Sequence, residues 1–346
     1  MRLLFAVFLM VSGTLALAAP RGDELFAAHC AACHGDTGAG GVGVPLSFPS
    51  FLDSVDDDFL RKTIRYGRPG RVMPAFRILS NAQVDAIVRY IRGWSDKPAP
   101  VFSDKPVAGN AKHGKQLFSS YCAACHGADG EGGKGTGVTF SRKRDLPIIA
   151  PALNNSGFLA AASDGMILHT LEYGRENTPM RSFLVQGLTE QDLDDLVSYV
   201  RSFANGKTPF DTPASSTAVA KTITAESSYS LQETIENLEG AIVSQNFILI
   251  RTETLEHGLI AEGEEDSKEI ILHFCNFSFL YEALKLDPRV GMFLPCRVTV
   301  TERDGKVMVT TINPLYLSRL FNNNELDEYC RQMYDVYSAI LEDATL

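Results

Sequence analysis

The chain has 346 residues and a formal net charge of −10, and 45% of its residues are hydrophobic. This length predicts two or three domains, and the composition is that of an ordinary globular protein. No basic stripe runs along the sequence, which argues against nucleic-acid binding. The acidic excess lies in residues 208–346, where 10 Lys and Arg stand against 22 Asp and Glu. We interpret it as a solvated surface, with a docking field for a basic partner as the alternative.

The first 18 residues are typical of a secretory signal peptide. Arg2 gives a short basic start, an apolar run extends from Leu3 to Leu17, and Ala16-Leu17-Ala18 fits a small-x-small cleavage site. A single membrane anchor is the alternative, although the run is short for a span. No later stretch is long and apolar enough to cross a bilayer. We therefore expect an exported, periplasmic protein with no transmembrane span after signal removal.

Two copies of a Cys-x-x-Cys-His motif organise the N-terminal part of the chain, at 30–34 and 122–126. Positions i and i+3 of a helical turn share a face. The two thiols can therefore add to the vinyl groups of one haem while the following His binds its iron. A single copy could instead serve zinc or thiol redox chemistry. The duplication predicts two covalently bound haem c groups, attached through Cys30, Cys33, Cys122 and Cys125.

An internal repeat surrounds the two motifs. Each motif is preceded by a helix with Gly and Phe at i and i+4, as Gly22-x-x-x-Phe26 and as Gly114-x-x-x-Phe118. We expect each glycine to let the closing helix of its unit approach closely. Capping-box patterns at Ser80 and Thr189 begin these closing helices, and apolar residues follow at helical spacing.

A methionine occupies the same place in each repeat, seven residues after the Tyr of a Tyr-Gly-Arg run. A thioether is a soft ligand that suits ferrous iron, and His/Met ligation raises a haem potential. Methionine is often only a core filler, but these two lie in proline-containing loops between helices. The predicted axial ligands are His34 with Met73 and His126 with Met180, and the weaker alternatives are His29, His113 and His169.

The second repeat carries a Gly-rich and basic insertion from Gly132 to Ile149, in which Arg142, Lys143 and Arg144 cluster. It is either a solvated surface insertion or a partner-docking loop. Because the second haem motif also stands nearer in sequence to the acidic region, we expect the second haem to communicate with that region.

The pattern changes after a stretch rich in Thr, Ser, Pro and Ala that ends near residue 220, because Val, Ile, Thr and Phe then alternate in short runs. The expected strands are 221–226, 247–255 and 269–275, and a hairpin at 295–312 turns at Asp304-Gly305. The expected helices are 231–245, capped by Ser230, then 277–286 and a last helix from about Asn324. This order predicts an α+β domain.

Three cysteines lie outside the haem motifs. Cys275 ends one expected strand and Cys296 begins another, so the two could face each other. Three interpretations stay open: a structural disulfide, two unpaired buried thiols, or a reactive pair that accepts or delivers sulfur or electrons. Cys330 shares a helix face with Leu326 and Met333 and is expected in the core.

Residues 20–206 resemble two tandem class I cytochrome c domains, similar to the small dihaem cytochromes of bacterial respiratory chains. The resemblance rests on the haem motifs, the methionines and the helix crossing completed by Tyr90 and Tyr199. It implies partly exposed haem edges that pass single electrons, with both iron positions filled by protein ligands. Pro151-Ala152-Leu153 resembles the segment that backs the proximal His, and Pro49-Ser50-Phe51-Leu52 is its weaker counterpart.

Residues 221–346 resemble the bacterial domain of unknown function 302. The resemblance rests on the helix start at Ser230, the segment from His273 to Leu284 and the hairpin after Phe293. It implies a compact α+β fold and leaves the biochemical role open.

The sequence thus predicts a multidomain protein, with two all-α cytochrome c domains followed by an α+β domain. The expected boundaries are 1–18 for the signal peptide, 19–94 and 111–206 for the cytochrome c domains, 95–110 and 207–220 for the linkers, and 221–346 for the last domain. The predicted function is single-electron transfer between periplasmic or membrane redox partners, such as respiratory complexes, which favours a carrier over an enzyme. The alternatives are an enzyme subunit in which Cys275 and Cys296 handle a sulfur compound and the haems drain its electrons, and a last domain that only dimerises.

Overall fold

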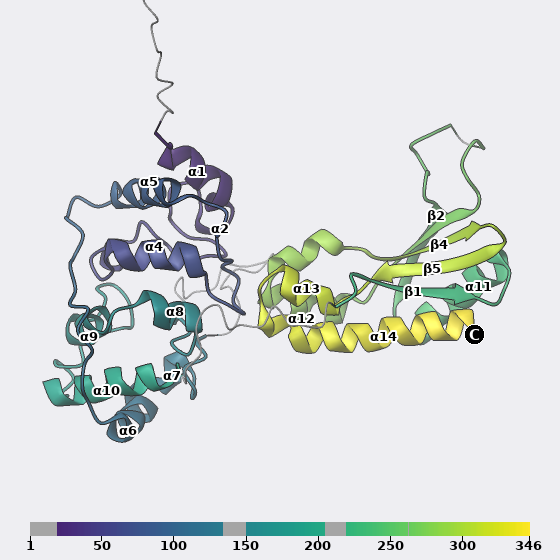
Figure 1. The fold of residues 1–346 in the computed structure, drawn as a ribbon. Helices are drawn as coiled ribbons and strands as arrows, with labels where there is room; N and C mark the ends of the chain where they lie inside the picture. The colour runs from purple at the N-terminus through teal and green to yellow at the C-terminus, as the bar shows by residue number, and fades with distance from the viewer. Residues whose placement is uncertain (1–18, 134–149, 205–218, 262) are drawn as a thin grey trace, which may run out of the picture.

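The computed structural model describes residues 19–133, 150–204, 219–261 and 263–346 (Figure 1). The predicted signal peptide and nearly all of the basic insertion and of the second linker lie outside the described residues. Within the described ranges, no helix is both long and apolar enough to cross a membrane.

Two helical units follow one another, as the repeat predicts. The first contains α1 (Gly22–His29), α2 (Ala31–His34), α3 (Pro49–Leu52), α4 (Asp57–Tyr66) and α5 (Asn81–Arg92). The second contains α6 (Ala111–Tyr121), α7 (Ala123–His126), α8 (Ser156–Ala161), α9 (Asp164–Tyr173) and α10 (Glu190–Ser202). Both predicted capping boxes form at the starts of α5 and α10.

The first and last helices of each unit cross at the predicted glycine. A Cβ atom on Gly22 would lie 2.1 Å from the backbone oxygen of Ala86 in α5, and one on Gly114 would lie 2.0 Å from that of Asp195 in α10. One turn further on, the ring centroids of Phe26 and Tyr90 are 5.4 Å apart. The corresponding pair in the second unit, Phe118 and Tyr199, is 5.3 Å apart. The predicted helix crossing is therefore confirmed in both units.

The two helical units pack against each other through α4 and α8 (Figure 1). The Phe59 and Phe158 rings meet edge to face at 6.4 Å between centroids, and Asn155 donates a hydrogen bond of 2.8 Å to the backbone oxygen of Pro69. A Cβ atom on Gly157 would lie 2.2 Å from the backbone oxygen of Gly67. One continuous apolar core runs through both units, so their relative position is fixed by close packing.

The C-terminal region is the predicted α+β domain. Its strands are β1 (Thr222–Ser227), β2 (Ile248–Thr254), β3 (Glu269–Cys275), β4 (Cys296–Arg303) and β5 (Lys306–Ile312), in the antiparallel order β1-β5-β4-β3-β2. Asp304 and Gly305 both have positive φ, which matches the predicted hairpin turn. Helices α11 (Leu231–Ser244) and α14 (Asp327–Thr345) pack on the sheet and bury its main core.

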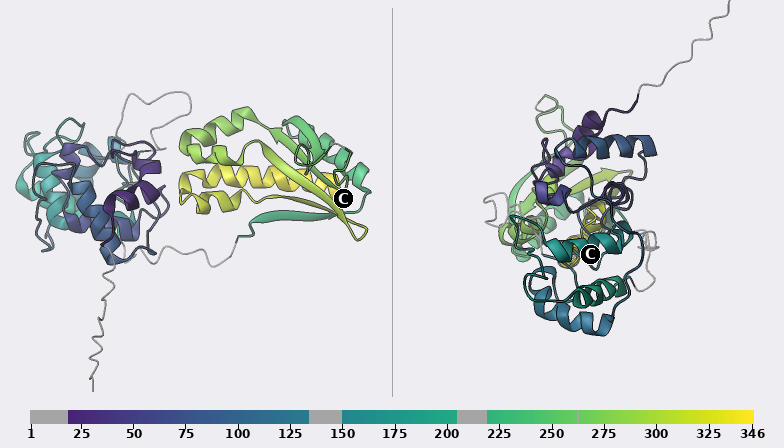
Figure 2. Two further views of the ribbon diagram at one scale, coloured as in Figure 1. Left: turned by 90° about the horizontal axis from the view of Figure 1, so that it is seen from above. Right: turned by 90° about the vertical axis from the view of Figure 1, so that its left-hand side faces the viewer.

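A smaller core fills the end of this domain that points toward the helical units (Figures 1 and 2). It lies among α12 (Phe277–Leu286), the 3-10 helix η1 (Pro288–Phe293), α13 (Leu315–Leu320), the 3-10 helix η2 (Asn324–Leu326) and the start of α14. Cys330 is buried in it, as predicted. The sequence patterns missed α13 and η1, because short helices carry too few turns for a clear period.

The crossing glycines lead to a prediction about stability. In Gly114→Ala the new methyl group would press on the α10 backbone, which cannot rotate away, so we expect a loss of about 1–3 kcal/mol. Gly240→Ala in α11 is the matched control, since no atom lies within 4 Å of its Cβ position, and it should gain about 0.5–1 kcal/mol. Urea unfolding followed by circular dichroism measures both. Equal stability of Gly114→Ala and wild type would contradict the close crossing.

Candidate haem sites

Each Cys-x-x-Cys-His motif forms a sharp junction between two helices. In the first unit, α1 ends at His29, the Cys30 N–H donates to the Phe26 oxygen, and the turn α2 then carries Cys33 and His34. The second unit repeats this geometry, with the Cys122 N–H donating to the Phe118 oxygen. The junction places both thiols and the imidazole of a motif within one short turn, as haem attachment requires.

Both motif histidines are oriented by a backbone carbonyl. His34 and His126 are each 9% exposed. The His34 Nδ1 atom lies 2.8 Å from the Val44 oxygen, and the His126 Nδ1 atom lies 2.9 Å from the Pro151 oxygen. A carbonyl only accepts, so Nδ1 carries the hydrogen and Nε2 keeps a lone pair. Burial lowers the pKa of both imidazoles, so each is a neutral ligand ready for a metal.

The segments that back the two histidines differ from each other. Pro151 takes the predicted position behind His126. In the first unit the carbonyl belongs to Val44, whereas the predicted segment Pro49–Leu52 forms α3 instead. The reason is local, because the Gly43 N–H donates to the Cys33 oxygen and folds this loop over the ring. A Cβ atom on Gly43 would lie 2.7 Å from the His34 ring, so only glycine fits there.

The two predicted methionine ligands lie in loops of the same form. The Arg68 N–H donates to the Met73 oxygen at 2.9 Å, and the Arg175 N–H donates to the Met180 oxygen at 2.6 Å. Both methionines are half-buried, and Met180 packs against the core of the helical units. Met73 and Met180 thus remain the predicted sixth ligands. We call the group Cys30, Cys33, His34 and Met73 the first site, and the group Cys122, Cys125, His126 and Met180 the second site.

The first thiol of each motif, Cys30 and Cys122, is poorly suited to zinc or thiol redox chemistry, whereas Cys125 is exposed. Burial, with a smaller contribution from the second thiol of each motif, raises the pKa of Cys30 to about 11 and that of Cys122 to about 12. Redox and zinc-binding cysteines need an accessible thiolate. Among the described residues, no group of three or more His, Cys, Asp or Glu ligand atoms gathers at either motif. These observations favour thioether attachment.

Two half-buried arginines fit a haem and were missed by the sequence analysis. Burial lowers the pKa of Arg68 and of Arg175 to about 10, and no described carboxylate contributes to either shift. Arg68 lies over the rings of Phe59 and Phe158, at 5.5 and 5.9 Å. The Nε atom of Arg175 is buried without a hydrogen-bond partner among the described residues. A cation that is partly removed from water without an anion loses hydration, and the haem propionates would supply that anion. The repeated Tyr-Gly-Arg run was the available signal.

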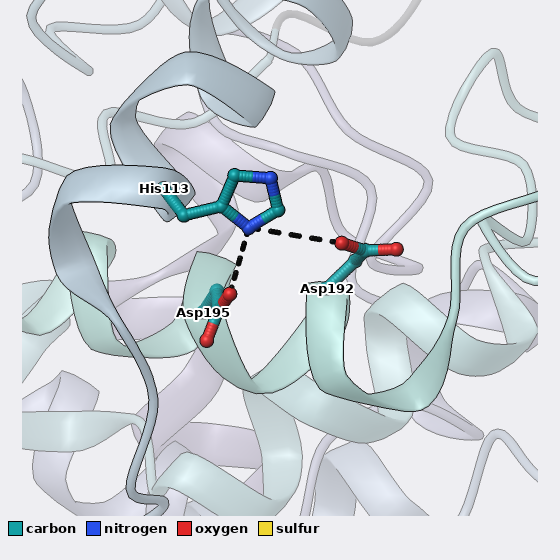
Figure 3. Close-up of side chains that lie close together, drawn as sticks. All are labelled: His113, Asp192 and Asp195. Atoms are coloured by element: carbon teal, nitrogen blue, oxygen red, sulfur yellow. Dashed lines mark hydrogen bonds and ion pairs between the residues drawn. The ribbon is translucent and has the colours of Figure 1, made fainter.

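His113 belongs to a structural network rather than to a haem site (Figure 3). Its Nδ1 atom donates to Asp195 at 2.8 Å and lies 3.8 Å from Asp192. Asp195 also accepts from the Asn110 N–H at 2.6 Å and from Gln191 at 2.9 Å, and Asp192 caps α10 through Thr189. The carboxylates are thus already satisfied without a cation. This network fixes the start of α6 against α10.

Cys275 and Cys296 are free thiols in the structure. Cys296 pairs with Phe274 in the β3–β4 register, one residue before Cys275. Burial raises the pKa of the Cys275 thiol to about 11, and the neighbouring Cys296 makes a smaller contribution in the same direction. Burial also raises the pKa of Cys296. Neither thiol has the lowered pKa that a reactive pair needs.

The C-terminal domain contacts the first site, contrary to the expectation that it communicates with the second. The Asn324 N–H donates to the Gly70 oxygen at 2.9 Å, and Arg71 forms an ion pair with Glu325. Gly70 and Arg71 belong to the loop that carries Met73. Nearness in sequence was a poor guide here, because the chain between the second unit and β1 is long enough to return to the first unit.

Comparisons with known proteins identify all three regions. The family model for cytochrome c oxidase, cbb3-type, subunit III matches residues 17–91, the cytochrome c model matches 111–204, and the model for domain of unknown function DUF302 matches 223–344. A cbb3-type cytochrome c oxidase subunit CcoP from Azospirillum sp. (strain B510) is 29% identical over 56% of this chain and 64% of the relative. A subunit FixP from Azorhizobium caulinodans is 33% identical over 36% of this chain and 43% of the relative.

This chain spans less than two thirds of the length of these curated relatives. Among solved structures, an uncharacterised DUF302 protein from Bacillus stearothermophilus is 25% identical, with a TM-score of 0.34, over 36% of this chain and 99% of that one. The matched families confirm the predicted helical cytochrome c region and the α+β domain after it. Cytochrome c domains bind haem c covalently and transfer electrons.

The network around Asp195 predicts a pH-dependent stability. Burial alone would raise the pKa of Asp195, but hydrogen bonds from Asn110, His113 and Gln191 outweigh it and hold that pKa below its usual value. A carboxylate with a depressed folded-state pKa stabilises fully above its unfolded pKa of about 3.9, and the contribution is lost as pH falls through the folded-state pKa. Asp195→Asn should therefore lose about 1–3 kcal/mol at pH 7 and much less at pH 3.

Urea unfolding at both pH values measures the difference, with Asp343→Asn, an exposed carboxylate on α14, as the control. An equal penalty at pH 7 and at pH 3 would show that the charge of Asp195 is not what stabilises the network.

Proposed function

We propose that this chain, which carries two cytochrome c domains and a C-terminal DUF302 domain, is an exported dihaem cytochrome that moves single electrons between redox partners. The observation that carries the proposal is the paired geometry of His34 and His126. Each is buried, each donates from Nδ1 to a carbonyl, and each keeps Nε2 free for a metal. One such site could be incidental, whereas two at matching places in a repeat support a dihaem protein.

The residues that would hold each cofactor follow from the two sites. Cys30 and Cys33 would form the thioether bonds of the first haem, and Cys122 and Cys125 those of the second. His34 with Met73 and His126 with Met180 would be the axial ligands, and Arg68 and Arg175 would neutralise propionates. A haem c with this ligation supplies one-electron chemistry at a raised potential.

The packing of the helical units supports transfer between the two sites. Arg68 follows α4 and lies over Phe158, which belongs to α8 of the other unit. Arg175 of the second unit lies 5.7 Å from the ring of Phe51 in the first. The predicted propionate partners of both haems thus lie at the contact between the units. This arrangement favours a short path for an electron from one unit to the other.

The domain limits, localisation and partners are part of the same proposal. We place the cytochrome c domains at 19–94 and 111–206 and the last domain at 221–346, with a signal peptide at 1–18. The names of the relatives describe subunits of cbb3-type cytochrome c oxidase. A membrane respiratory complex is therefore the partner class that we propose, with the protein itself in the periplasm. The alternative of sulfur chemistry at Cys275 and Cys296 is not favoured, because both thiol pKa values are raised.

The number of covalent haems is directly measurable. The wild-type protein, made with the haem-attachment machinery, should keep two haems after denaturation, as read by intact mass. Cys30→Ser/Cys33→Ser and Cys122→Ser/Cys125→Ser should each keep one. The double variant Cys275→Ser/Cys296→Ser is the control and should keep two. Two haems in either motif variant would contradict the assignment.

The methionine ligands have a separate test. Met73→His and Met180→His should each lower one of the two midpoint potentials by tenths of a volt, within the range of roughly 0.8 V that axial ligands span. Each should also change the visible spectrum of one haem. Redox titration with optical detection measures both effects. Met166→Leu, a buried core methionine in α9, is the control and should leave both potentials in place. Unchanged potentials in a histidine variant would show that the ligand was wrongly chosen.

A further inference from the structure

The two methionine loops are equal in length but are braced differently. The first loop runs from Gly67 to Phe76 and the second from Gly174 to Phe183. The fourth residue of each has a positive φ, 73° for Gly70 and 59° for Asn177. The backbones therefore turn in the same way at the same place, although one unit uses glycine and the other asparagine.

The second loop is braced from within. Its Thr178 hydroxyl donates to the Arg175 oxygen at 2.7 Å and accepts from the Met180 N–H at 3.1 Å. The carbonyl that precedes the left-handed turn and the backbone of the methionine are thus connected through one side chain of the same loop.

The first loop has Arg71 in the place of Thr178, and its brace comes from the C-terminal domain instead. The Asn322 side-chain NH2 group donates to the Arg68 oxygen at 3.0 Å and to the Met73 oxygen at 2.9 Å, and it also contacts the Arg71 oxygen. The Asn322 side-chain oxygen accepts from the Gly70 N–H at 3.0 Å. Because the partners are three acceptors and one donor, they fix which way this amide points.

The sequence of the first loop fits this contact. A Cβ atom on Gly70 would lie 2.4 Å from the side-chain nitrogen of Asn324, so an asparagine there, as at Asn177, would force the Asn324 side chain out of its place. Arg71 forms its ion pair with Glu325, and both side chains are largely buried, at 26% and 16% exposed. Gly70 and Arg71, which stand where the second loop has Asn177 and Thr178, both meet the C-terminal domain.

Residues 322–325, which we call the arm, make these contacts. The arm is held in place by the rest of the C-terminal domain. Asn322 has a φ of +50°, and the neighbouring Asn323 is buried and donates to Asp287 at 3.2 Å. Asp287 is itself fully buried and paired with Arg289 at 2.6 Å, and Arg289 also donates to the Phe321 oxygen. The smaller core of the domain holds Phe321 and Leu326 on either side of the arm. The arm therefore meets the loop as a preformed surface.

We propose that the C-terminal domain is a clamp on the first methionine loop, in which Asn322 is a positioning residue for Met73. The clamp supplies from a separate domain the brace that Thr178 supplies inside the second unit. Its effect on ligation rests on the proposed function, because it assumes that Met73 is an iron ligand. The position of the Met73 backbone therefore depends on the docking of the C-terminal domain, whereas the position of the Met180 backbone does not.

Two variants of the full-length dihaem protein break the clamp from opposite sides. Asn322→Gly removes the side-chain amide, and glycine tolerates the left-handed backbone there. Gly70→Asn introduces the residue that the second loop has at Asn177, which keeps the turn but places a side chain against Asn324. The matched controls are Asn246→Gly, another left-handed asparagine of the same domain, and Asn177→Gly in the second loop. Hydrogen exchange of the peptide 67–73, with 174–180 as an internal reference, reports docking. Imidazole binding to the ferric protein reports displacement of the methionine.

In both clamp variants we expect exchange of the first loop to speed up about tenfold or more, with the second loop unchanged. We also expect imidazole to bind the first site about tenfold more tightly, as for the loss of one or two net hydrogen bonds. A Met180→His background removes the second site from the titration. The controls Asn246→Gly and Asn177→Gly should show the wild-type exchange rate of the first loop and the wild-type imidazole affinity of the first site.

Unchanged exchange in both clamp variants would overturn the clamp. Faster exchange with unchanged imidazole affinity would overturn the positioning role of Asn322, because docking would then not affect the ligand. Failure of the proposed function is distinguished by Met73→His: an unchanged spectrum in that variant would reject Met73 as ligand, while the exchange result would still decide whether the domain docks.

Discussion

The close crossing of the first and last helices is the constraint on which each cytochrome unit depends. At Gly22 and Gly114 the backbone of one helix lies directly against the backbone of the other, with no space for a methyl group. This contact fixes where the first helix ends, and the haem motif begins at that end. The position of two thiols and one imidazole in each unit therefore depends on one glycine, about two helical turns before the motif.

The haem motifs then impose a second requirement, which is an oriented neutral imidazole. The backbone meets it in two ways, through Val44 in one unit and Pro151 in the other. Different loops reach the same hydrogen bond because only the carbonyl matters, not the side chain that carries it. The two sites thus share the same hydrogen bond although the segments that supply it differ.

Much of the fold, and the residues of each candidate haem site, could be predicted from local patterns. The Cys-x-x-Cys-His spacing identifies Cys30, Cys33 and His34, and helical periodicity predicts the helix crossing at Gly22. The hairpin at Asp304-Gly305 likewise depends on two adjacent residues. These features are readable because the residues that interact are close in sequence or repeated at a fixed interval.

The parts that could not be predicted are long-range. The partner of His34 was placed at Pro49–Leu52, but a glycine contact moves the loop so that Val44 takes the role. The Tyr-Gly-Arg runs mark Arg68 and Arg175, but the contacts of these arginines with the opposite unit are long-range and follow from no local pattern. The contact between Asn322 and the first loop joins residues about 250 positions apart, and a polar residue in a turn gives no sign of its distant partner.

The contact between the first loop and residues 322–325 can be weak and still form, because both partners belong to the same chain. A few hydrogen bonds and one ion pair would give only a weak, short-lived complex between separate proteins. Here both surfaces belong to one chain, so the effective concentration of one at the other is high, about millimolar for a short flexible linker. The contact is therefore insensitive to dilution of the protein, and it can be made of a few hydrogen bonds and one ion pair.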